Sequence, residues 1–143
     1  MKKYKIGYTT GVFDLFHIGH LNLLRQAKKQ CEYLMVGVSS DDLVTYKNKR
    51  CVIPFEERIQ IVQAIRYVDE AIPQLNMNKM EAWEAHPFNV IFVGDDWKNT
   101  KRWNRLEEEF GKIGVDIVYF PYTKSTSSTL LTEALLKLNH RMI

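Results

Sequence analysis

The sequence contains few residues of several kinds, and each shortage excludes a class of protein. Its 143 residues include only two cysteines, Cys31 and Cys51, which lie far apart and match no metal-ligand spacing. No apolar run approaches the ~18 residues of a membrane-spanning helix, and the opening "MKKYKIGYTT" lacks the apolar core of a signal peptide. We therefore expect a cytoplasmic protein with reduced thiols that does not enter the membrane.

Neither sign of charge is in large excess. The formal net charge is only +3, which does not favour a general nucleic-acid binder. Hydrophobic residues make up 45% of the chain, which is enough for a sizeable core and too many for a disordered protein. The sequence has no internal repeat, low-complexity stretch or linker, so its length predicts one domain over residues 1–143.

Apolar runs and helical patterns alternate along the chain. Near-continuous apolar runs predict strands at 4–10, 33–40, 90–95 and 115–121, and a shorter strand is expected at 69–74. Amphipathic patterns predict helices at 20–30, 55–68, 80–86, 101–114 and 127–139. This alternation predicts an α/β protein: a Rossmann-like doubly wound fold with a five-stranded parallel sheet flanked by helices. Ligands of such sheets bind beyond the carboxyl ends of the strands.

The stretch "GVFDLFHIGH", residues 11–20, follows the first predicted strand. Gly11 allows a tight turn there, and Gly19 lets a ligand approach the start of the next helix, whose free N–H groups suit a phosphate. His17 and His20 are three residues apart, so both imidazoles can face one side of that turn. Two such donors can hold a phosphate while charge builds on it. A zinc site is less favoured, because no third ligand has a suitable spacing.

Basic side chains follow the second predicted strand and occupy the next helix. Lys47 and Lys49 alternate in "YKNKR", so in an extended loop they point the same way. Arg58 and Arg66 lie near the two ends of the predicted helix 55–68. These four side chains are candidates for phosphate contacts. The alternatives are a solvated basic loop for the lysines and structural ion pairs for the arginines.

The stretch "GDDW", residues 94–97, follows another buried strand. Asp95 and Asp96 place two like charges side by side, which requires a cation or hydrogen-bond donors. Mg²⁺, ligand hydroxyl groups or nearby lysines can supply this balance, and a helix cap is the plain alternative. Trp97 either lines a ligand pocket or fills the core.

Three motifs together resemble a known family. The "HIGH" stretch matches the H-x-G-H signature of the nucleotidyltransferase superfamily, and "RYVDEAIP" (66–73) and "GDDW" resemble the bacterial glycerol-3-phosphate cytidylyltransferases. The resemblance extends from residue 4 to about residue 136. It implies that a small phospho-alcohol attacks the α-phosphorus of CTP, giving a CDP-alcohol and pyrophosphate. It also implies Mg²⁺ as cofactor, a homodimer, and a role in supplying CDP-glycerol for a cell-surface polymer.

The resemblance also implies roles for individual residues. His17, His20, Lys47 and Asp14 would be catalytic, with Asp14 organising the loop or the metal, whose ligands stay unassigned. The residues expected to bind the nucleotide are Gly11, Val12, Phe13, Gly19, Lys49, Arg58, Gly94, Thr123, Ser127, Ser128 and Thr129. The residues expected to bind the acceptor are Arg66, Asp95, Asp96, Trp97 and Tyr122.

The stretch "PYTKSTSST", residues 121–129, departs from the family pattern R-T-E-G-I-S-T-T. Tyr122 replaces the arginine of the pattern, Lys124 replaces the glutamate and Ser125 replaces the glycine. A planar cation is thereby exchanged for a phenol, so a bidentate phosphate contact is lost. This change leaves open both how the triphosphate is bound and which acceptor is used.

Several alternatives to glycerol 3-phosphate therefore remain. The acceptor can be phosphocholine, phosphoethanolamine, another polyol phosphate or a capsule precursor, and phosphocholine calls for an aromatic cage, for which Tyr122, Trp97 and Trp103 are candidates. The nucleotide can be ATP, as in the adenylyltransferases of the superfamily. A nucleotide-binding regulatory module without catalysis is disfavoured, because His17, His20, Lys47 and Asp14 are intact.

Overall fold

The computed structural model describes residues 2–46, 50–121 and 128–141. Its centre is a five-stranded sheet in the order β3-β2-β1-β4-β5, and every neighbouring pair is parallel. The predicted fold class is confirmed. The strands are β1 (Tyr4–Gly11), β2 (Cys31–Ser39), β3 (Glu70–Gln74), β4 (Val90–Gly94) and β5 (Asp116–Phe120).

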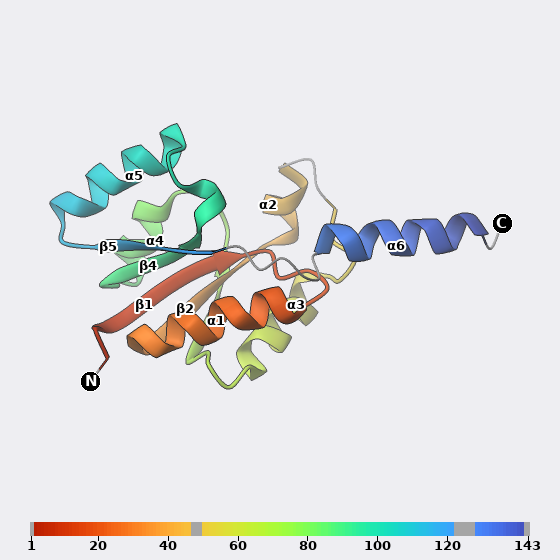
Figure 1. Ribbon diagram of the computed structural model, residues 1–143, viewed down its shortest axis with the longest axis horizontal. Helices are drawn as coiled ribbons and strands as arrows, with labels where there is room; N and C mark the ends of the chain where they lie inside the picture. The colour runs from red at the N-terminus through yellow and green to blue at the C-terminus, as the bar shows by residue number, and fades with distance from the viewer. Residues whose placement is uncertain (1, 47–49, 122–127, 142–143) are drawn as a thin grey trace.

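Helices cover both faces of this sheet. In Figure 1, α1 and α3 lie below the sheet and α4 and α5 lie above it, while α6 extends beyond the carboxyl ends of the strands. Among the described helices, none is long and apolar enough to cross a membrane. The helical elements are α1 (Ile18–Gln30), α2 (Asp41–Tyr46), α3 (Phe55–Ala64), α4 (Lys79–Ala85), the 3-10 turn η1 (Asp95–Trp97), α5 (Lys101–Lys112) and α6 (Ser128–Arg141).

The core has two layers, one on each face of the sheet. Leu24 and Ala27 of α1 and Val62 of α3 are fully buried against one face. Trp103 and Phe110 of α5 pack on the other face, together with side chains of α4. The central strands β2, β1 and β4 are covered on both sides, so they read as near-continuous apolar runs and were predicted on that ground. The edge strand β3 is less buried, and it was expected as a shorter strand.

Most helices lie within two residues of their predicted bounds, and two differences are larger. The helix predicted over 55–68 corresponds to α3 and ends at Ala64, because Ile65 adopts an extended conformation. The short helix α2 follows β2, where only a loop was expected. The helix predicted over 101–114 corresponds to α5 and ends at Lys112, and Gly114, with a φ of 77°, directly follows its cap residue Ile113.

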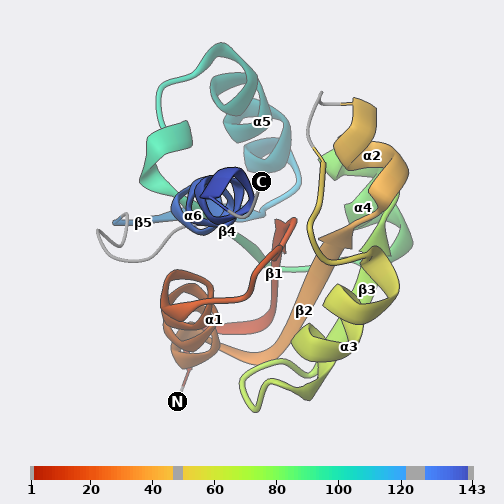
Figure 2. The same cartoon turned by 90° about the vertical axis from the view of Figure 1, so that its right-hand side faces the viewer.

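The strand order reverses between β1 and β4, and this point determines where ligands bind. After β1 the chain continues to β2 and β3 on one side of β1, and it later forms β4 on the other side. Sheets of this kind bind ligands at the carboxyl ends of the two strands where the order reverses, here β1 and β4. Figure 2 looks onto this edge of the sheet, with α6 in front of it. The H-x-G-H segment follows β1 and the "GDDW" segment follows β4, so both motifs lie at this edge.

Candidate active site

The turn after β1 differs from the prediction that Gly11 forms it. Gly11 is still part of β1 and pairs with Val38, whereas Phe13 and Leu15 adopt left-handed conformations with φ values of 55° and 50°. A glycine is needed at position 11 for close packing instead, because a Cβ atom there would lie 2.9 Å from the Phe13 ring. Left-handed backbone costs roughly 1–2 kcal/mol in residues other than glycine. The turn that leads to the histidines is therefore strained and held by its surroundings.

The two histidines cap the start of α1 through their own side chains. His17 is the N-cap residue, and its Nδ1 atom accepts a hydrogen bond from the Gly19 N–H at 3.0 Å. The Nδ1 atom of His20 accepts one from the His17 N–H at 3.3 Å. The two rings stack with their centroids 3.9 Å apart. Because each Nδ1 atom is an acceptor, the proton of each neutral imidazole is on Nε2, which is thus a donor.

Burial keeps both imidazoles uncharged near neutral pH. It lowers the pKa of His17 below its usual value. Burial first, and neighbouring His17 second, lower the pKa of His20 to about 4, while Asp14 acts in the opposite direction. The pair thus presents two neutral N–H donors, which can donate to phosphate oxygens without accepting a proton first.

A cavity of about 390 Å³ lies beside His20. It joins the loop after β1 to three segments that are distant in sequence: α2, the chain around residue 50, and the first turns of α6. Arg50, Cys51, Thr132 and Glu133 were not predicted for this site; only Arg50 had a signal, as part of the basic stretch "YKNKR". The lining residues are Val12, Phe13, Asp14, His20, Val44, Arg50, Cys51, Thr129, Thr132 and Glu133.

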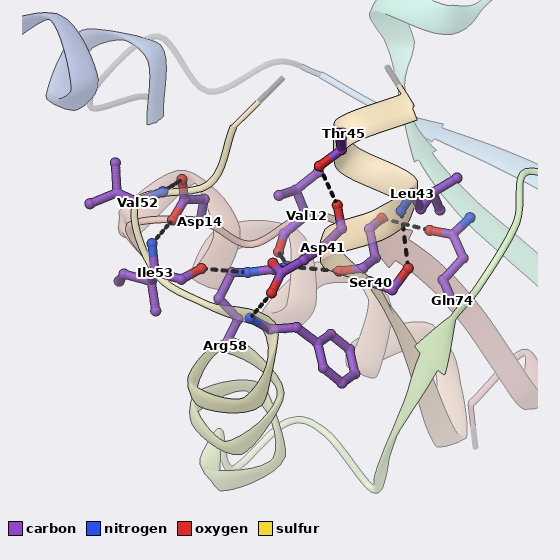
Figure 3. A network of polar contacts seen from close by, with 12 residues as sticks. Val12, Asp14, Ser40, Asp41, Leu43, Thr45, Val52, Ile53, Arg58 and Gln74 are labelled. Carbon is purple, nitrogen blue, oxygen red and sulfur yellow. Dashed lines mark hydrogen bonds and ion pairs between the residues drawn. The ribbon is translucent and has the colours of Figure 1, made fainter. Parts of the chain in front are cut away.

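Asp14 organises the loop that carries part of this cavity. One oxygen of its carboxylate accepts a hydrogen bond from the Val52 N–H at 2.8 Å, and the other accepts one from the Ile53 N–H at 2.9 Å. Figure 3 shows this clamp between the turn after β1 and the segment before α3. The clamp fits the loop-organising role among the two that were expected for Asp14. It holds Arg50 and Cys51 next to the histidine turn.

Arg58 does not offer a free guanidinium to a nucleotide, and this corrects its predicted role. Its side chain is fully buried, with an exposed fraction of 0%. It donates to the carbonyl oxygens of Ile53, Val12 and Ser39 at 2.6–2.9 Å and to Asp41 Oδ1 at 2.7 Å. The structural ion pair, which was the alternative, is what the structure contains. Arg58 ties the ends of β1 and β2 to α2 and α3 (Figure 3).

Asp41 completes this network from the start of α2. Its Oδ2 atom accepts a hydrogen bond from the Phe55 N–H at 3.1 Å. This bond, followed by the contact with the Arg58 guanidinium, lowers the pKa of Asp41 below its usual range. The carboxylate therefore stays ionised at neutral pH and balances the buried cation.

The "GDDW" segment lies at the carboxyl end of β4 with its acidic side chains exposed. Gly94 ends the strand, and Asp95, Asp96 and Trp97 form the turn η1. Neither aspartate caps α5, because Thr100 is its N-cap residue. Trp97 is 47% exposed, which excludes the alternative that it fills the core. These side chains remain available to a ligand at this edge.

Arg66 lies apart from the histidines in this chain. It follows the end of α3 and precedes β3, so it is on the amino side of that strand, whereas His17 follows the carboxyl end of β1. Its side chain is exposed and is not among the residues that line the cavity beside His20. In the structure of one chain, Arg66, which was expected to bind the acceptor, therefore does not lie beside the histidine pair.

Five predicted site residues lie outside the described part of the chain, namely Lys47, Lys49, Tyr122, Thr123 and Ser127. Described residues next to these segments line the cavity beside His20. Arg50 lines the cavity immediately after the lysine stretch, and Thr129 lines it from the start of α6. Ser128 is the first residue of α6.

Comparisons with known proteins identify the class to which this site belongs. Residues 8–136 match the family model described as cytidylyltransferase-like, so the chain belongs to this family and is a nucleotidyltransferase. It is 37% identical to the glycerol-3-phosphate cytidylyltransferase of Bacillus subtilis over 126 residues, which cover 87% of this chain and 92% of that one. It is 32% identical to the Staphylococcus aureus protein of the same name over 128 residues, which cover 89% and 92% of the two chains.

Two further similarities show how broad the fold family is. The chain is 37% identical to the FAD synthase of Thermococcus kodakarensis over 117 residues, which cover 78% of this chain and 76% of that one. A lipopolysaccharide core biosynthesis protein from Thermoplasma volcanium superimposes with a TM-score of 0.72 at 24% identity, over 86% of this chain and 99% of that chain. The second similarity shows the shared fold alone.

Proposed function

We propose that this protein transfers CMP from CTP to glycerol 3-phosphate and releases CDP-glycerol and pyrophosphate. The observation that carries the proposal is the pair of neutral imidazoles at the start of α1, with both Nδ1 atoms bound to backbone N–H groups. The choice of CTP and glycerol 3-phosphate is supported by the relatives named glycerol-3-phosphate cytidylyltransferase, which this chain matches over 92% of their length.

The reaction explains why neutral donors suffice. An oxygen of the acceptor's ionised phosphate forms the new bond to the α-phosphorus, and the bond from that phosphorus to the bridging oxygen of pyrophosphate breaks. No proton has to be removed from the acceptor, so a general base is unnecessary, and positioning and charge stabilisation dominate. His17 and His20 donate from Nε2 to phosphate oxygens, and Arg50 places a positive charge at the same cavity.

We propose that Mg²⁺ enters together with the nucleotide. Among the described residues, no three histidine, cysteine, aspartate or glutamate side chains gather into a metal site. Mg²⁺ does not need such a cage, because it keeps several waters and binds through one or two carboxylates and the substrate phosphates. Asp14 and Glu133 are the carboxylates that line the cavity and would hold the ion there. When bound, the ion would neutralise charge on the phosphates.

We also infer, from the family resemblance, a cytoplasmic homodimer that supplies CDP-glycerol for a cell-surface polymer. Cys31 and Cys51 are both free thiols, which supports a reducing compartment. Sedimentation equilibrium tests the oligomeric state, since a single species with the mass of one 16.8 kDa chain would contradict the dimer.

ATP is the second candidate nucleotide, because the chain is also 37% identical to a FAD synthase. The experiment that separates the candidates incubates purified protein and Mg²⁺ with CTP or ATP and a panel of phospho-alcohols, and identifies the nucleotide product by chromatography. The proposal predicts CDP-glycerol from CTP and glycerol 3-phosphate. A product only with phosphocholine, phosphoethanolamine or another polyol phosphate would change the acceptor. A product only with ATP would contradict the proposed nucleotide.

A further inference from the structure

A second cavity, of about 340 Å³, lies between the edge strand β3 and α4, which are neighbours in Figure 2. We call it the α4–β3 cavity. It shares no described lining residue with the cavity beside His20. Its volume is typical of small-molecule sites, and so are its apolar walls. The apolar lining residues are Ile72, Pro73, Leu75, Ala82 and Ala85.

The side chain of Tyr8 reaches the α4–β3 cavity from β1, at the centre of the sheet. Tyr8 is 2% exposed, and its ring stacks on that of Phe88 with 4.8 Å between the centroids. Gly37 of β2 leaves space for the Tyr8 hydroxyl group, because a Cβ atom there would lie 2.5 Å from the phenol oxygen. Packing therefore holds this hydroxyl group in one place, above β2.

Two polar groups at the α4–β3 cavity make no hydrogen bond with the described part of the chain. They are the hydroxyl group of Tyr8 and the Nε2 group of Gln74, whose Oε1 atom accepts from the Ser39 hydroxyl at 2.8 Å. Gln74 is only 7% exposed, and Figure 3 shows its side chain at the end of β3. Every fully buried side-chain nitrogen or oxygen atom of the described residues has a partner. These two groups therefore retain contact with solvent, and they do so at the cavity that both residues line.

Both of these groups are hydrogen-bond donors at neutral pH. Burial raises the pKa of Tyr8 to about 12, so the phenol keeps its proton, and the amide nitrogen of Gln74 carries two. Lys79 adds a positive charge to the lining. Glu81 also lines the cavity, but its carboxylate already accepts a hydrogen bond from Asn76 at 2.8 Å. The composition therefore suits a ligand that carries acceptor oxygens on an apolar body.

We propose that the α4–β3 cavity binds a small organic carboxylate with an apolar body. One carboxylate oxygen accepts from the Tyr8 hydroxyl group and the other from Gln74 Nε2, and hydrogen bonds to an ionised acceptor are stronger than neutral ones. The apolar body of the ligand lies against the walls of the cavity and displaces water from them. The site goes beyond the proposed CMP transfer, since neither His17 nor His20 lines it.

Titration of the full chain with benzoate tests the proposal, with the amide signals of the NMR spectrum as the readout. Benzoate combines a carboxylate with an apolar ring, and it should bind with a Kd of about 1 mM or tighter and shift signals of β3 and α4. Benzylamine has the same ring but carries a cation in place of the acceptor oxygens, so it should not saturate these shifts. Equal binding of both compounds, or no saturable binding of benzoate, would overturn the proposal.

The Tyr8→Phe variant removes only the hydroxyl group. It should weaken benzoate binding about tenfold or more, because a hydrogen bond to a charged group is lost. Its midpoint of unfolding in urea should match that of the wild type, since this hydroxyl group has no partner among the described residues. Tyr33→Phe is the matched control: the Tyr33 hydroxyl donates to Glu70, outside the cavity, so the Kd for benzoate should stay within about twofold. The same Kd in wild type and Tyr8→Phe contradicts the proposal.

The Ala85→Leu variant narrows the cavity without removing a donor. Ala85 is exposed in the last turn of α4, and leucine is a good helix former, so the chain should fold with this change. Benzoate binding should again weaken about tenfold or more, because the added side chain occupies the space of the ligand. This variant decides the question if Tyr8→Phe does not fold, and benzoate binding as tight as in the wild type would place the ligand elsewhere and refute the site.

Discussion

Replacing Arg58 by methionine tests whether this residue holds the site together or binds the nucleotide. In the structure, its guanidinium donates to three main-chain carbonyl oxygens and to Asp41. Methionine fills similar volume but donates no hydrogen bond, so these acceptors lose their partner inside the protein. Asp41, with 52% of its side chain exposed, can be solvated when Arg58 is removed, so the cost comes from the carbonyl oxygens. A buried acceptor left without a partner costs about 1–3 kcal/mol, and two of the three carbonyl bonds are only partly buried, so the free energy of unfolding should fall by roughly 3–5 kcal/mol.

Urea-induced unfolding, followed by tryptophan fluorescence, measures the change. A domain of this size is typically stable by about 5–15 kcal/mol, so the Arg58→Met protein should still be folded at 25 °C. Its m-value should match that of the wild type, since the surface exposed on unfolding is similar. Arg25→Met is the control: Arg25 is half-buried, donates to Asn22 and should contribute less than about 1 kcal/mol.

The Arg58→Lys variant separates the two roles. A lysine carries the charge but has no planar fork that reaches four acceptors, so the structural role predicts clear destabilisation. Turnover should fall as well, because Val12 and the turn after it lose their anchor. If instead both variants unfold like the wild type and only the affinity for CTP decreases, Arg58 binds the nucleotide and its structural role is refuted.

Three further predictions concern the histidine turn. His17→Asn keeps a side-chain acceptor for the Gly19 N–H but removes the Nε2 donor, so stability should change by less than about 1 kcal/mol while turnover falls about 100-fold or more; equal losses of both would contradict this. Burial lowers the pKa of His20 to about 4 in the folded chain. Between about pH 6.5 and pH 4, this histidine is therefore protonated in the unfolded chain but neutral in the folded one. Stability should therefore fall by about 3 kcal/mol as the pH drops from about 6.5 to about 4, and His20→Asn should lose this pH dependence in urea titrations. Asp14→Asn leaves one oxygen for the N–H groups of Val52 and Ile53, so stability should fall by about 1–3 kcal/mol and the KM for CTP should rise; an unchanged KM would separate this loop from the nucleotide.

Much of the fold could be predicted because the central strands are buried on both faces. A run such as residues 33–40 contains apolar residues at nearly every position, and in a chain with alternating helices this pattern is typical of a strand inside a parallel sheet. Once the sheet is parallel, its topology places whatever follows β1 and β4 at one edge. The H-x-G-H and "GDDW" segments could therefore be placed correctly from the amino-acid sequence alone.

The local geometry could not be predicted, because it depends on contacts between distant segments. The three carbonyl groups that bind Arg58 come from the ends of β1 and β2 and from the segment before α3, and an arginine in a helical pattern gives no sign of them. Glycine is the residue expected where the backbone turns, yet the left-handed residues are Phe13 and Leu15, held by packing. Arg66 matched a motif, although its place before the strand predicted at 69–74 already put it on the amino side of the sheet, where the structure has it.

The most direct test of the proposed CMP transfer is the initial rate of pyrophosphate release by the purified protein with Mg²⁺, CTP and glycerol 3-phosphate, with ATP in place of CTP as the comparison. We expect release that requires both CTP and glycerol 3-phosphate and that falls about 100-fold or more in His17→Asn. No release with any phospho-alcohol, or release that is as fast with ATP, would contradict the proposed function.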